Sequence, residues 1–312
     1  MTDLAIVIVA YKTRDVLDAC LRSLAADRRL SSAQIVVVDN ASGDGTPDMV
    51  RAKYPGVLLI VNEKNAGYSV ANNQGIRATA SRHVLLLNPD TEAPEGVISG
   101  MADFLDRYPR VGFVGCQLLN TDGTDQQSWY PLPLPLSRYI EKKPWYPRLA
   151  RRALGIRDAE PEPSGNSAFR VDIVKGACLM VRREALDAAG LMDEASFLYA
   201  DDIDLCIRLR RAGWDACLLP NLKMTHHGYV STGQEVFLTI VSSRRSALYL
   251  YRKHFPTWMV FFWSLFIYAE ILYKWMWNRI RLSRRPGDSR VRERWRAFRV
   301  LGREILGFTG ND

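Results

Sequence analysis

Four short apolar runs recur in the first hundred residues, and a segment with helical spacing follows each of them. The runs are residues 4–11, 33–39, 57–62 and 83–88. Continuous hydrophobic runs of this length are typical of strands buried on both faces of a parallel sheet. The intervening segments place apolar residues three or four positions apart, as amphipathic helices do. The alternation predicts an α/β domain over residues 1–110, with a Rossmann-like, mainly parallel sheet flanked by helices.

The pattern changes after residue 110. Residues 129–164 are rich in proline, aromatic residues and arginine, and segments of that length are typical of functional or disordered loops. This loop either contacts an amphipathic or anionic substrate or is a surface insertion. A strand and helix follow in 171–190, a helix with an acidic start in 197–214, and an amphipathic helix in 236–255. Residues 111–255 are therefore expected to complete the same domain.

Residues 256–312 form a tail of different character. The uncharged run from Pro256 to Ala269 has 14 residues, fewer than the roughly 20 that span a bilayer as a helix, and Glu270 and Lys274 interrupt its continuation. Tryptophans and an arginine-rich stretch follow, a combination typical of helices that lie on an anionic leaflet. We expect residues 256–300 to lie on a membrane surface. A buried helix, a homodimer interface and a membrane span are the alternatives.

The charge distribution agrees with this division. The chain carries a net charge of +8, but residues 244–312 contain 15 basic and 5 acidic residues, so the tail is +10 and the remainder −2. The basic character therefore indicates where the protein sits, and no nucleic-acid partner is expected. Five scattered cysteines without a CxxC pair predict neither a disulfide framework nor a zinc site, and they favour a reducing cytoplasm. No secretory signal is expected, because the first apolar run is short.

Polar residues follow the ends of the predicted strands, where open α/β sheets bind their ligands. Asp39 follows the second strand and can accept hydrogen bonds from a ribose or from a base ring N–H. Asp90 follows the fourth strand and can bind Mg²⁺ or Mn²⁺ together with phosphate oxygens. A simple turn is the alternative at both positions. Neither a GxGxxG nor a GxxxxGK[ST] loop follows the first strand.

Three further groups of residues are candidates for chemistry. Asn65, Gly67 and Asn72 cluster at the third strand–helix junction, where amides and a small residue let a polar ligand approach the backbone. His226, which precedes a second histidine, is a candidate to complete a metal shell, with a structural role as the alternative. Asp201 and Asp202 can supply a general base, although acidic residues also stabilise a helix N-terminus.

Seven segments, in this order, resemble the family 2 glycosyltransferases, and most of all their bacterial rhamnosyltransferase-like branch. The segments are VIVAYKTRDVLDACLRSL, IVVVDNASGDGT, NAGYSVANNQGI, LLLNPDTE, KGACLMVRREAL, GLMDEASFLYADDIDLCIRLRRAGW and HHGYVSTG. The resemblance covers residues 4–255. It implies a GT-A fold and inverting sugar transfer from a nucleotide-sugar donor. Together with the apolar, basic tail, the bacterial resemblance predicts a cytoplasmic protein that is peripheral on the inner face of the plasma membrane.

The resemblance also implies roles for individual residues. Asp39 matches the acid that binds base and ribose, Asp90 the last acid of the metal-binding DxD motif, and Asp202 the general base. The chain departs from the family where Asn88 replaces the first DxD acid and Asp201 replaces a glutamate, so either aspartate of the second pair can be the base, and Asp202 is favoured. His226 matches a histidine near the diphosphate and the metal. The implied donor site comprises Ala10, Tyr11, Asp39, Asn65, Gly67, Asn72, Asn88 and Asp90, and the implied acceptor contacts are Lys175, Gly176 and Ala177.

The resulting hypothesis is a metal-dependent transferase that moves L-rhamnose from dTDP-rhamnose to a hydroxyl of a lipid-linked saccharide in cell-envelope polysaccharide synthesis. A UDP-sugar donor and a polyprenyl phosphate acceptor are alternatives within the same class. A nucleotidyltransferase would normally have a glycine-rich loop after the first strand, which VAYKTRD lacks. A non-enzymatic nucleotide- or membrane-binding module is the last alternative, and acidic residues at several separate strand and helix ends disfavour it.

Overall fold

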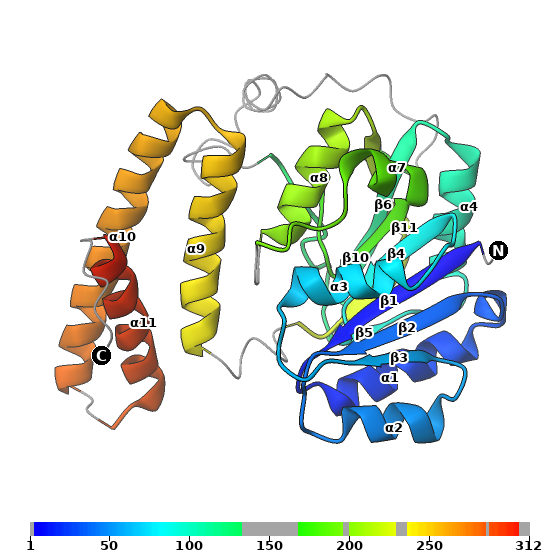
Figure 1. Cartoon of the computed structure of the whole chain (residues 1–312), viewed down its shortest axis with the longest axis horizontal. Helices are drawn as coiled ribbons and strands as arrows, with labels where there is room; N and C mark the ends of the chain where they lie inside the picture. The colour runs from blue at the N-terminus through cyan, green and yellow to red at the C-terminus, as the bar shows by residue number, and fades with distance from the viewer. Residues whose placement is uncertain (1–2, 133–167, 196–199, 229–235, 285–286, 306–312) are drawn as a thin grey trace. The chain divides into compact units, whose positions relative to one another are not determined.

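A computed structural model describes residues 3–132, 168–195, 200–228, 236–284 and 287–305. The chain divides into two compact units (Figure 1). The first unit contains residues up to Val230 except Leu198–Ala200, and the second contains Ser231–Asp312 together with that short segment.

A nine-stranded sheet forms the centre of the first unit. Its strand order is β3-β2-β1-β4-β10-β6-β11-β5, with β8 paired to β11. The strands β1 (Leu4–Ala10), β2 (Gln34–Asp39), β3 (Leu58–Val61) and β4 (His83–Leu87) are parallel neighbours. This confirms the mainly parallel half predicted from the apolar runs.

The other half of the sheet is mixed. Strand β10 (Cys178–Arg182) is antiparallel to both β4 and β6 (Val111–Leu119), while β11 (Asp215–His226) runs parallel to β6. The sequence did not predict β11 as a strand. The short strands are β5 (Thr91–Glu92), β7 (Trp129–Tyr130), β8 (Phe169–Arg170) and β9 (Ile173–Val174). Strand β5 pairs antiparallel with the end of β11, and β7 pairs with β9.

Helices cover both faces of the sheet, which explains why β1 is buried along its whole length. The helices are α1 (Arg14–Ala26), η1 (Arg28–Leu30), α2 (Thr46–Lys53), α3 (Tyr68–Arg77), α4 (Val97–Arg107), α7 (Arg183–Ala189) and α8 (Asp201–Arg211). Ile6 and Ile8 pack into the large core that contains residues of α1, α2 and α4, whereas Val9 packs with Ala71 of α3. A Cβ at Gly75 would clash with Val7, so glycine permits the close approach of α3 to β1.

The described part of the second unit contains three helices, α9 (Val236–His254), α10 (Thr257–Arg284) and α11 (Ser289–Ile305). A small core joins them, formed by Val241, Ile267, Ile271, Ala297, Phe298 and Leu301. Glu270 accepts hydrogen bonds from Arg244 at 2.7 Å and lies 2.7 Å from the Lys274 ammonium. Glu270 and Lys274, which interrupt the uncharged run, therefore lie inside α10 and are paired within the three-helix unit.

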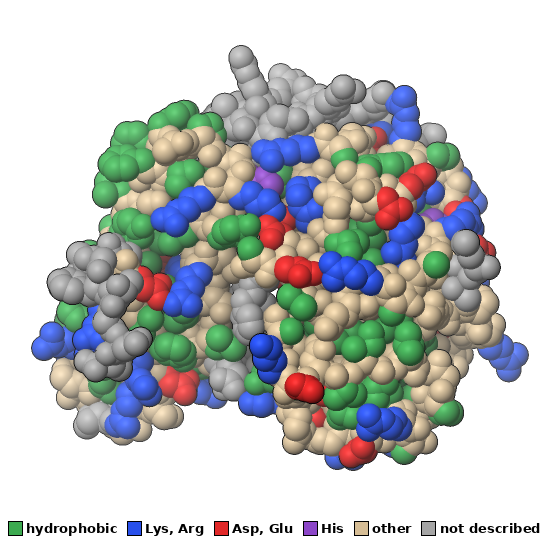
Figure 2. Space-filling model, viewed as in Figure 1, with side chains coloured by type: hydrophobic (Ala, Val, Ile, Leu, Met, Phe, Trp, Pro, Cys, Tyr) green, Lys and Arg blue, Asp and Glu red, His purple; other side chains and the backbone are tan. Residues whose placement is uncertain are grey.

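One face of α10 is left uncovered by the described residues of its own unit. Its exposed apolar residues are Trp258, Phe261, Phe262, Leu265, Phe266, Leu272, Tyr273, Met276, Trp277 and Ile280. Their spacing of three, four and seven places them on one side of the helix. Figure 2 shows hydrophobic side chains gathered on the surface formed by the start of α10. Among the described residues, α10 is the one helix long and apolar enough to cross a membrane by length and composition.

Most of the predicted 129–164 loop lies outside the described residues, which include only residues 129–132 of it. The contacts group α9 with α10 and α11, so the division between the units falls near residue 230. The predicted boundaries at residues 110 and 255 stay predictions.

Candidate active site

The carboxyl ends of β2, β1 and β4 lie side by side at one edge of the sheet. The register pairs Ala10 of β1 with Asp39 of β2, and Ile8 with Leu87 of β4. Residues that directly follow these strands therefore meet at this edge, which is where an open α/β sheet presents its ligand site.

Asp39 is buried, with only 1% of its surface exposed. Its Oδ2 accepts a hydrogen bond from the backbone N–H of Ser42 at 3.3 Å. Its Oδ1 has no hydrogen-bond partner among the described residues, although it is also buried. A buried carboxylate oxygen without a partner is costly, so Asp39 is suited to accept a hydrogen bond from a ligand.

Asn40 organises the loops beside Asp39, and the sequence reasoning missed it. Its Nδ2 donates to Oδ1 of Asn65 at 2.9 Å and to the carbonyl of Gly67 at 3.3 Å, while its Oδ1 accepts from the backbone N–H of Ala66 at 2.9 Å. Asn65 also accepts from the N–H of Gly67 at 3.0 Å. Asn65 and Gly67 thus define the loop at the β3–α3 junction, and the direct adjacency of Asn40 to Asp39 was the available signal.

Asp90 and His226 meet although 136 positions separate them in the sequence. Oδ1 of Asp90 lies 3.4 Å from Nε2 of His226, and both side chains are 7% exposed. Nδ2 of Asn88 is also 3.4 Å from the same ring nitrogen. Burial works to raise the pKa of Asp90, but the hydrogen bond and the positive charge that His226 supplies in its protonated form outweigh burial and hold that pKa below its ordinary value. The second histidine, His227, pairs instead with Glu92 at 2.7 Å.

Asp202 is held by backbone N–H groups at the start of α8. Its Oδ2 accepts from the N–H of Gly176 at 2.8 Å, and its Oδ1 accepts from the N–H of Ile203 at 2.8 Å. A Cβ at Gly176 would lie 2.9 Å from Cβ of Asp202, so only glycine allows this approach. Asp201 receives the N–H of Asp202 on Oδ1 at 3.1 Å, and its buried Oδ2 has no partner among the described residues.

The two aspartates differ in protonation. Burial, followed by the charge of Asp202, raises the pKa of Asp201 to about 7. Burial also raises the pKa of Asp202, but the N–H groups of Gly176 and Ile203 and the charge of Lys175 oppose that rise. Two backbone N–H groups donate to Asp202, whereas Oδ2 of Asp201 has no partner among the described residues, so a single negative charge on the pair is favoured on Asp202, which can then accept a proton from a substrate.

Tyr68 connects the two parts of the site, and the sequence did not single it out. Its hydroxyl lies 3.2 Å from Oδ1 of Asn88 and 3.4 Å from the carbonyl of Gly176. Burial raises the pKa of Tyr68, and the charges of Asp201 and Asp202 raise it further, so the phenol stays protonated. The backbone N–H of Asn88 also donates to the carbonyl of Ala177 at 3.0 Å, which fixes the spacing between β4 and β10.

Lys175 points into the same region. Its ammonium donates to Oε1 of Gln126 at 2.8 Å. Burial lowers the pKa of Lys175, while the charges of Asp202 and Asp90 oppose that shift. Gln126 was not among the predicted residues, and it also contacts His226.

Two predicted donor-site residues have internal partners. Nδ2 of Asn72 donates to the carbonyl of Tyr68 at 3.0 Å within α3, so this amide is not part of the connected set at the sheet edge. The ring of Tyr11 lies under the ammonium of Lys12, 5.1 Å from ring centroid to nitrogen. The predicted binding roles of both residues stay predictions.

Backbone strain concentrates around the site. Among the described residues, the non-glycine residues with positive φ are Lys12, Ala41 and Ala200, at 55°, 63° and 61°. They follow β1, follow β2 and precede α8, respectively. Strained backbone of this kind clusters at functional sites, where the surrounding structure holds it in place.

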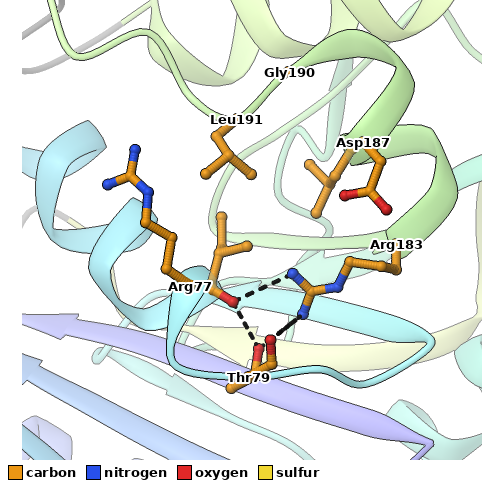
Figure 3. A pocket seen from close by; sticks show the side chains of 8 residues that line it. Arg77, Thr79, Arg183, Asp187, Gly190 and Leu191 are labelled. Atoms are coloured by element: carbon orange, nitrogen blue, oxygen red, sulfur yellow. Dashed lines mark hydrogen bonds between the residues drawn. The ribbon is translucent and has the colours of Figure 1, made fainter.

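A separate pocket of about 410 Å³ lies between the end of α3 and α7 (Figure 3). Its lining residues are Ile76, Arg77, Thr79, Arg183, Leu186, Asp187, Gly190 and Leu191. Arg183 donates to the carbonyl and hydroxyl oxygens of Thr79, as Figure 3 shows, and Arg77 pairs with Glu194 at 3.0 Å. Both guanidinium groups thus have protein partners, and none of the predicted site residues lines this pocket.

Asp90 and His226 supply part of the ligand set that a divalent cation needs at the sheet edge. Oδ1 of Asp90 and Nε2 of His226, at 3.4 Å, are close enough to bind one ion, and oxygen and imidazole ligands suit Mn²⁺ and, with more oxygen, Mg²⁺. The part of the chain that the structure describes holds no group of three or more His, Cys, Asp or Glu residues arranged for a metal. A bound diphosphate would have to supply further ligands, so the fit is to a metal–nucleotide complex.

Comparison with known proteins agrees with this geometry. The model of the family "Glycosyltransferase like family 2" matches residues 2–254. An N-acetylglucosaminyl-diphospho-decaprenol L-rhamnosyltransferase of Mycobacterium tuberculosis is 31% identical over 281 residues, covering 83% of this chain and 87% of that protein. A dTDP-rhamnosyl transferase of Shigella flexneri is 22% identical, covering 66% of this chain and 64% of that protein.

The fold has solved counterparts as well. A mannosyltransferase from Pyrobaculum calidifontis, solved in complex with GDP-Man and Mn²⁺, superposes with a TM-score of 0.55 at 16% identity, covering 99% of this chain and 76% of that one. At that identity the likeness concerns the fold, and it confirms the predicted GT-A class. The chain therefore belongs to the family 2 glycosyltransferases and is a glycosyltransferase of GT-A fold.

Proposed function

We propose that the protein transfers L-rhamnose from dTDP-rhamnose to a hydroxyl of a lipid-linked saccharide, with inversion at the anomeric carbon, in the synthesis of a cell-envelope polysaccharide. The relatives from M. tuberculosis and S. flexneri are named for rhamnose transfer, and the first of them for a decaprenol-linked acceptor. The observation that carries the proposal is the placement of Asp202, held by backbone N–H groups, and of the Asp90–His226 pair at one sheet edge, with Lys175 near both.

The chemical roles follow from the described contacts. Asp39 accepts the ring N–H of the nucleobase on its open Oδ1. Asp202 removes the proton from the acceptor hydroxyl, and that oxygen attacks the anomeric carbon from the face opposite the nucleotide. The bond between the sugar and the diphosphate breaks as the new bond forms, and the nucleoside diphosphate leaves. Lys175 lies near both Asp90 and Asp202 and contributes positive charge between donor and acceptor.

Asp90 and His226 are the residues that would hold a divalent cation, Mg²⁺ or Mn²⁺. Such a cation neutralises charge on the departing diphosphate when it is bound. With one carboxylate and one imidazole in place, the site should bind the ion much more tightly together with the nucleotide than alone.

A UDP-sugar is the second donor candidate, because the N–H that Asp39 would bind is common to thymine and uracil.

The proposed donor and acceptor are tested in a transfer assay with the purified full chain, Mn²⁺ and vesicles that contain polyprenyl diphosphate-linked N-acetylglucosamine. Polyprenyl phosphate replaces this acceptor in a parallel reaction, and dTDP-rhamnose is compared with UDP-glucose and UDP-galactose. Mass spectrometry of the lipid product should show the addition of one deoxyhexose to the saccharide acceptor only. Transfer from a UDP-sugar, or to polyprenyl phosphate, would replace the proposed substrates.

We also propose that the second unit holds the protein on the inner face of the plasma membrane through the open face of α10. The exposed apolar stripe runs from Trp258 to Ile280 and is rich in Trp, Phe and Tyr, which favour the membrane interface. Helix α11 carries Arg290, Arg292, Arg294, Arg296 and Arg299 as exposed residues. These charges suit the phosphate groups of an anionic leaflet.

The contacts within the unit favour a surface position over a span. Helices α9 and α11 pack against α10 through a shared core, so a spanning α10 would carry them into the bilayer. Each arginine at the bilayer centre costs at least about 2.5 kcal/mol, and α11 alone carries six arginines. The unit therefore lies flat, with the open face of α10 toward the lipid.

Vesicle sedimentation tests this placement. The variant Phe261→Ser/Phe262→Ser should bind anionic vesicles at least about 100-fold more weakly, because burial of one Phe contributes about 1.5–3 kcal/mol. Leu58→Ser, at an exposed apolar position on β3, is the matched control. Wild-type protein should leave membranes in alkaline carbonate. Protein that stays on the membranes in carbonate would indicate a span. If the wild type instead forms a concentration-dependent dimer that Phe261→Ser/Phe262→Ser abolishes, and vesicle binding is unchanged in that variant, the open face of α10 would be a homodimer interface.

A further inference from the structure

Gln126 contacts several groups around the candidate cation site, although the sequence did not single it out. Its Oε1 lies 2.6 Å from Nδ1 of His226 and accepts from the ammonium of Lys175 at 2.8 Å. Its Nε2 donates to the carbonyl of His226 at 3.2 Å and to Oδ1 of Asn120 at 2.9 Å. Its own backbone N–H donates to the carbonyl of Leu118 at 2.8 Å, which anchors it to the end of β6.

These contacts fix the orientation of the Gln126 amide. The ammonium of Lys175 has only donors, so the amide atom that faces it must be the oxygen. The carbonyl of His226 only accepts, so the atom that faces it must be the amide nitrogen. Both partners therefore require the same orientation of the amide. A flipped amide would place its NH₂ group against the ammonium and its oxygen against the carbonyl.

The orientation of Gln126 in turn determines the tautomer of His226. An amide oxygen can only accept, so Nδ1 of His226 must carry the hydrogen in the 2.6 Å contact. A neutral imidazole carries a single N–H, and Nε2 is therefore left with its lone pair.

The lone pair on Nε2 faces the carboxylate of Asp90. Nε2 and Oδ1 of Asp90 are 3.4 Å apart, and the amide of Asn88 lies at the same distance from Nε2. Two electron-pair donors that converge in this way are suited to a shared cation. Histidines that bind metals commonly donate their other N–H to an oxygen, which fixes ring and tautomer.

We propose that Gln126 is a positioning residue that fixes the Nδ1–H tautomer of His226 and so presents Nε2 to a divalent cation shared with Asp90. This inference deepens the proposed function and rests on its cation site. The shared oxygen of Gln126 also ties Lys175, on the acceptor side, to the histidine on the donor side. A merely structural Gln126 would join the 120–128 segment to the end of β11 without affecting the tautomer or the affinity for the ion.

The first measurement reads the tautomer without any metal. Long-range ¹H–¹⁵N spectra of the ¹⁵N-histidine-labelled full chain, recorded at about pH 8.5 where an ordinary histidine is neutral, distinguish the two tautomers. A His226→Gln spectrum assigns the signal. Wild type should show Nδ1–H, Gln126→Glu should keep it because a carboxylate also accepts, and Gln126→Met should lose it. Gln127→Met, at an exposed neighbouring glutamine, is the matched control.

The second measurement determines the affinity for Mn²⁺. Electron paramagnetic resonance with Mn²⁺ and dTDP should show affinity about 10- to 100-fold weaker in Gln126→Met, near wild type in Gln126→Glu, and unchanged in Gln127→Met. Nucleotide affinity without metal should stay the same in all variants.

The outcomes separate this inference from the function on which it rests. An Nε2–H tautomer in wild type, or an Nδ1–H tautomer that persists with unchanged Mn²⁺ affinity in Gln126→Met, would overturn the role of Gln126. Absence of Mn²⁺ binding by wild type in the presence of dTDP would overturn the cation site itself, and the positioning role with it, whatever the tautomer. The Nδ1–H tautomer in wild type, together with Mn²⁺ binding that is weakened in Gln126→Met but not in Gln126→Glu or Gln127→Met, would support both the positioning role and the cation site.

Discussion

Two buried carboxylate oxygens distinguish the site at the scale of single residues. Oδ1 of Asp39 and Oδ2 of Asp201 are buried and have no hydrogen-bond partner among the described residues. Leaving such groups unsatisfied costs folding free energy. Asp201 reduces this cost by binding a proton, since its pKa is raised to about 7. A ligand N–H would satisfy the open Oδ1 of Asp39.

Asp39→Asn should therefore weaken the binding of dTDP and UDP by about 10- to 100-fold. A hydrogen bond to a charged group contributes about 1.5–3 kcal/mol, and the amide can present a donor where the base N–H needs an acceptor. Isothermal titration calorimetry measures the affinity. Asp103→Asn, at an exposed carboxylate paired with Arg29, is the control and should bind normally. Equal affinity in wild type and Asp39→Asn would remove Asp39 from the base site.

The sequence could identify some of these residues but not others. Asp39 and Asp90 were predictable because each directly follows a continuous apolar run, and strand ends are local features of the sequence. Gln126 was not predictable, because its partners Lys175 and His226 lie 49 and 100 positions away. Polar residues whose role depends on such distant contacts leave no periodic pattern.

At the scale of elements, the site depends on the approach of α8 to the loop before β10. The Gly176 N–H holds Asp202, and the Gly176 carbonyl faces the hydroxyl of Tyr68 from α3. Three elements that are remote in the sequence thus position one carboxylate. The absence of a side chain at Gly176 is what allows the contact.

Gly176→Ala should displace Asp202 and lower kcat by about 10- to 100-fold, because small errors in placement of a catalytic group are costly. The added Cβ would lie 2.9 Å from Cβ of Asp202, closer than such atoms approach. Steady-state kinetics should show this loss, with nucleotide affinity within about twofold of wild type. Gly56→Ala is the matched control, since nothing lies within 4 Å of its added Cβ. Unchanged kcat in Gly176→Ala would show that the approach of α8 does not set the position of Asp202.

The elements themselves were unequally predictable. β1, β2, β4 and their helices follow from continuous apolar runs that alternate with helical spacing. The antiparallel insertion of β10 between β4 and β6 depends on pairing between segments about 90 positions apart, which local patterns do not encode. The twelve residues of β11 alternate poorly, with several exposed or half-buried positions after a register shift at Leu219/Lys223, and this weakened their strand signal.

In the whole molecule, the two units differ in charge and in proposed role. The catalytic unit carries little net charge and the helical tail most of the positive charge. A lipid-linked acceptor and a soluble nucleotide sugar meet only at a membrane surface, so a basic, apolar tail serves the proposed reaction.

The buried acidic pair should also affect the stability of the folded chain. The pKa of Asp201 is raised from 3.8 to about 7, so the folded state binds its proton more tightly than the unfolded state. This contribution to stability is complete below about pH 4 and is lost as pH rises toward 7. The lowered pKa of Asp90 acts in the opposite direction, but only below its ordinary value of 3.8.

Asp201→Asn should therefore raise the Tm relative to wild type at pH 8 and have a smaller effect, or the opposite one, at pH 5. Each kcal/mol corresponds to about 2–4 °C for a domain of this size, so thermal melts can resolve the difference. Wild type and Asp201→Asn share their other titrating groups, including His83 and Asp90, so the contributions of these groups to the pH dependence cancel in the Tm difference. The same Tm difference at pH 5 and pH 8 would show that Asp201 ionises normally in the folded chain.

We predict that Asp202, and not Asp201, is the general base of the glycosyl transfer. The most direct test measures single-turnover sugar transfer and donor binding in Asp202→Asn and Asp201→Asn side by side. Asp202→Asn should lose about 10²- to 10⁴-fold in transfer rate with donor affinity intact. Asp201→Asn, which imitates the protonated state, should retain transfer within about tenfold. Wild-type turnover in Asp202→Asn, or complete loss in Asp201→Asn alone, would contradict the account.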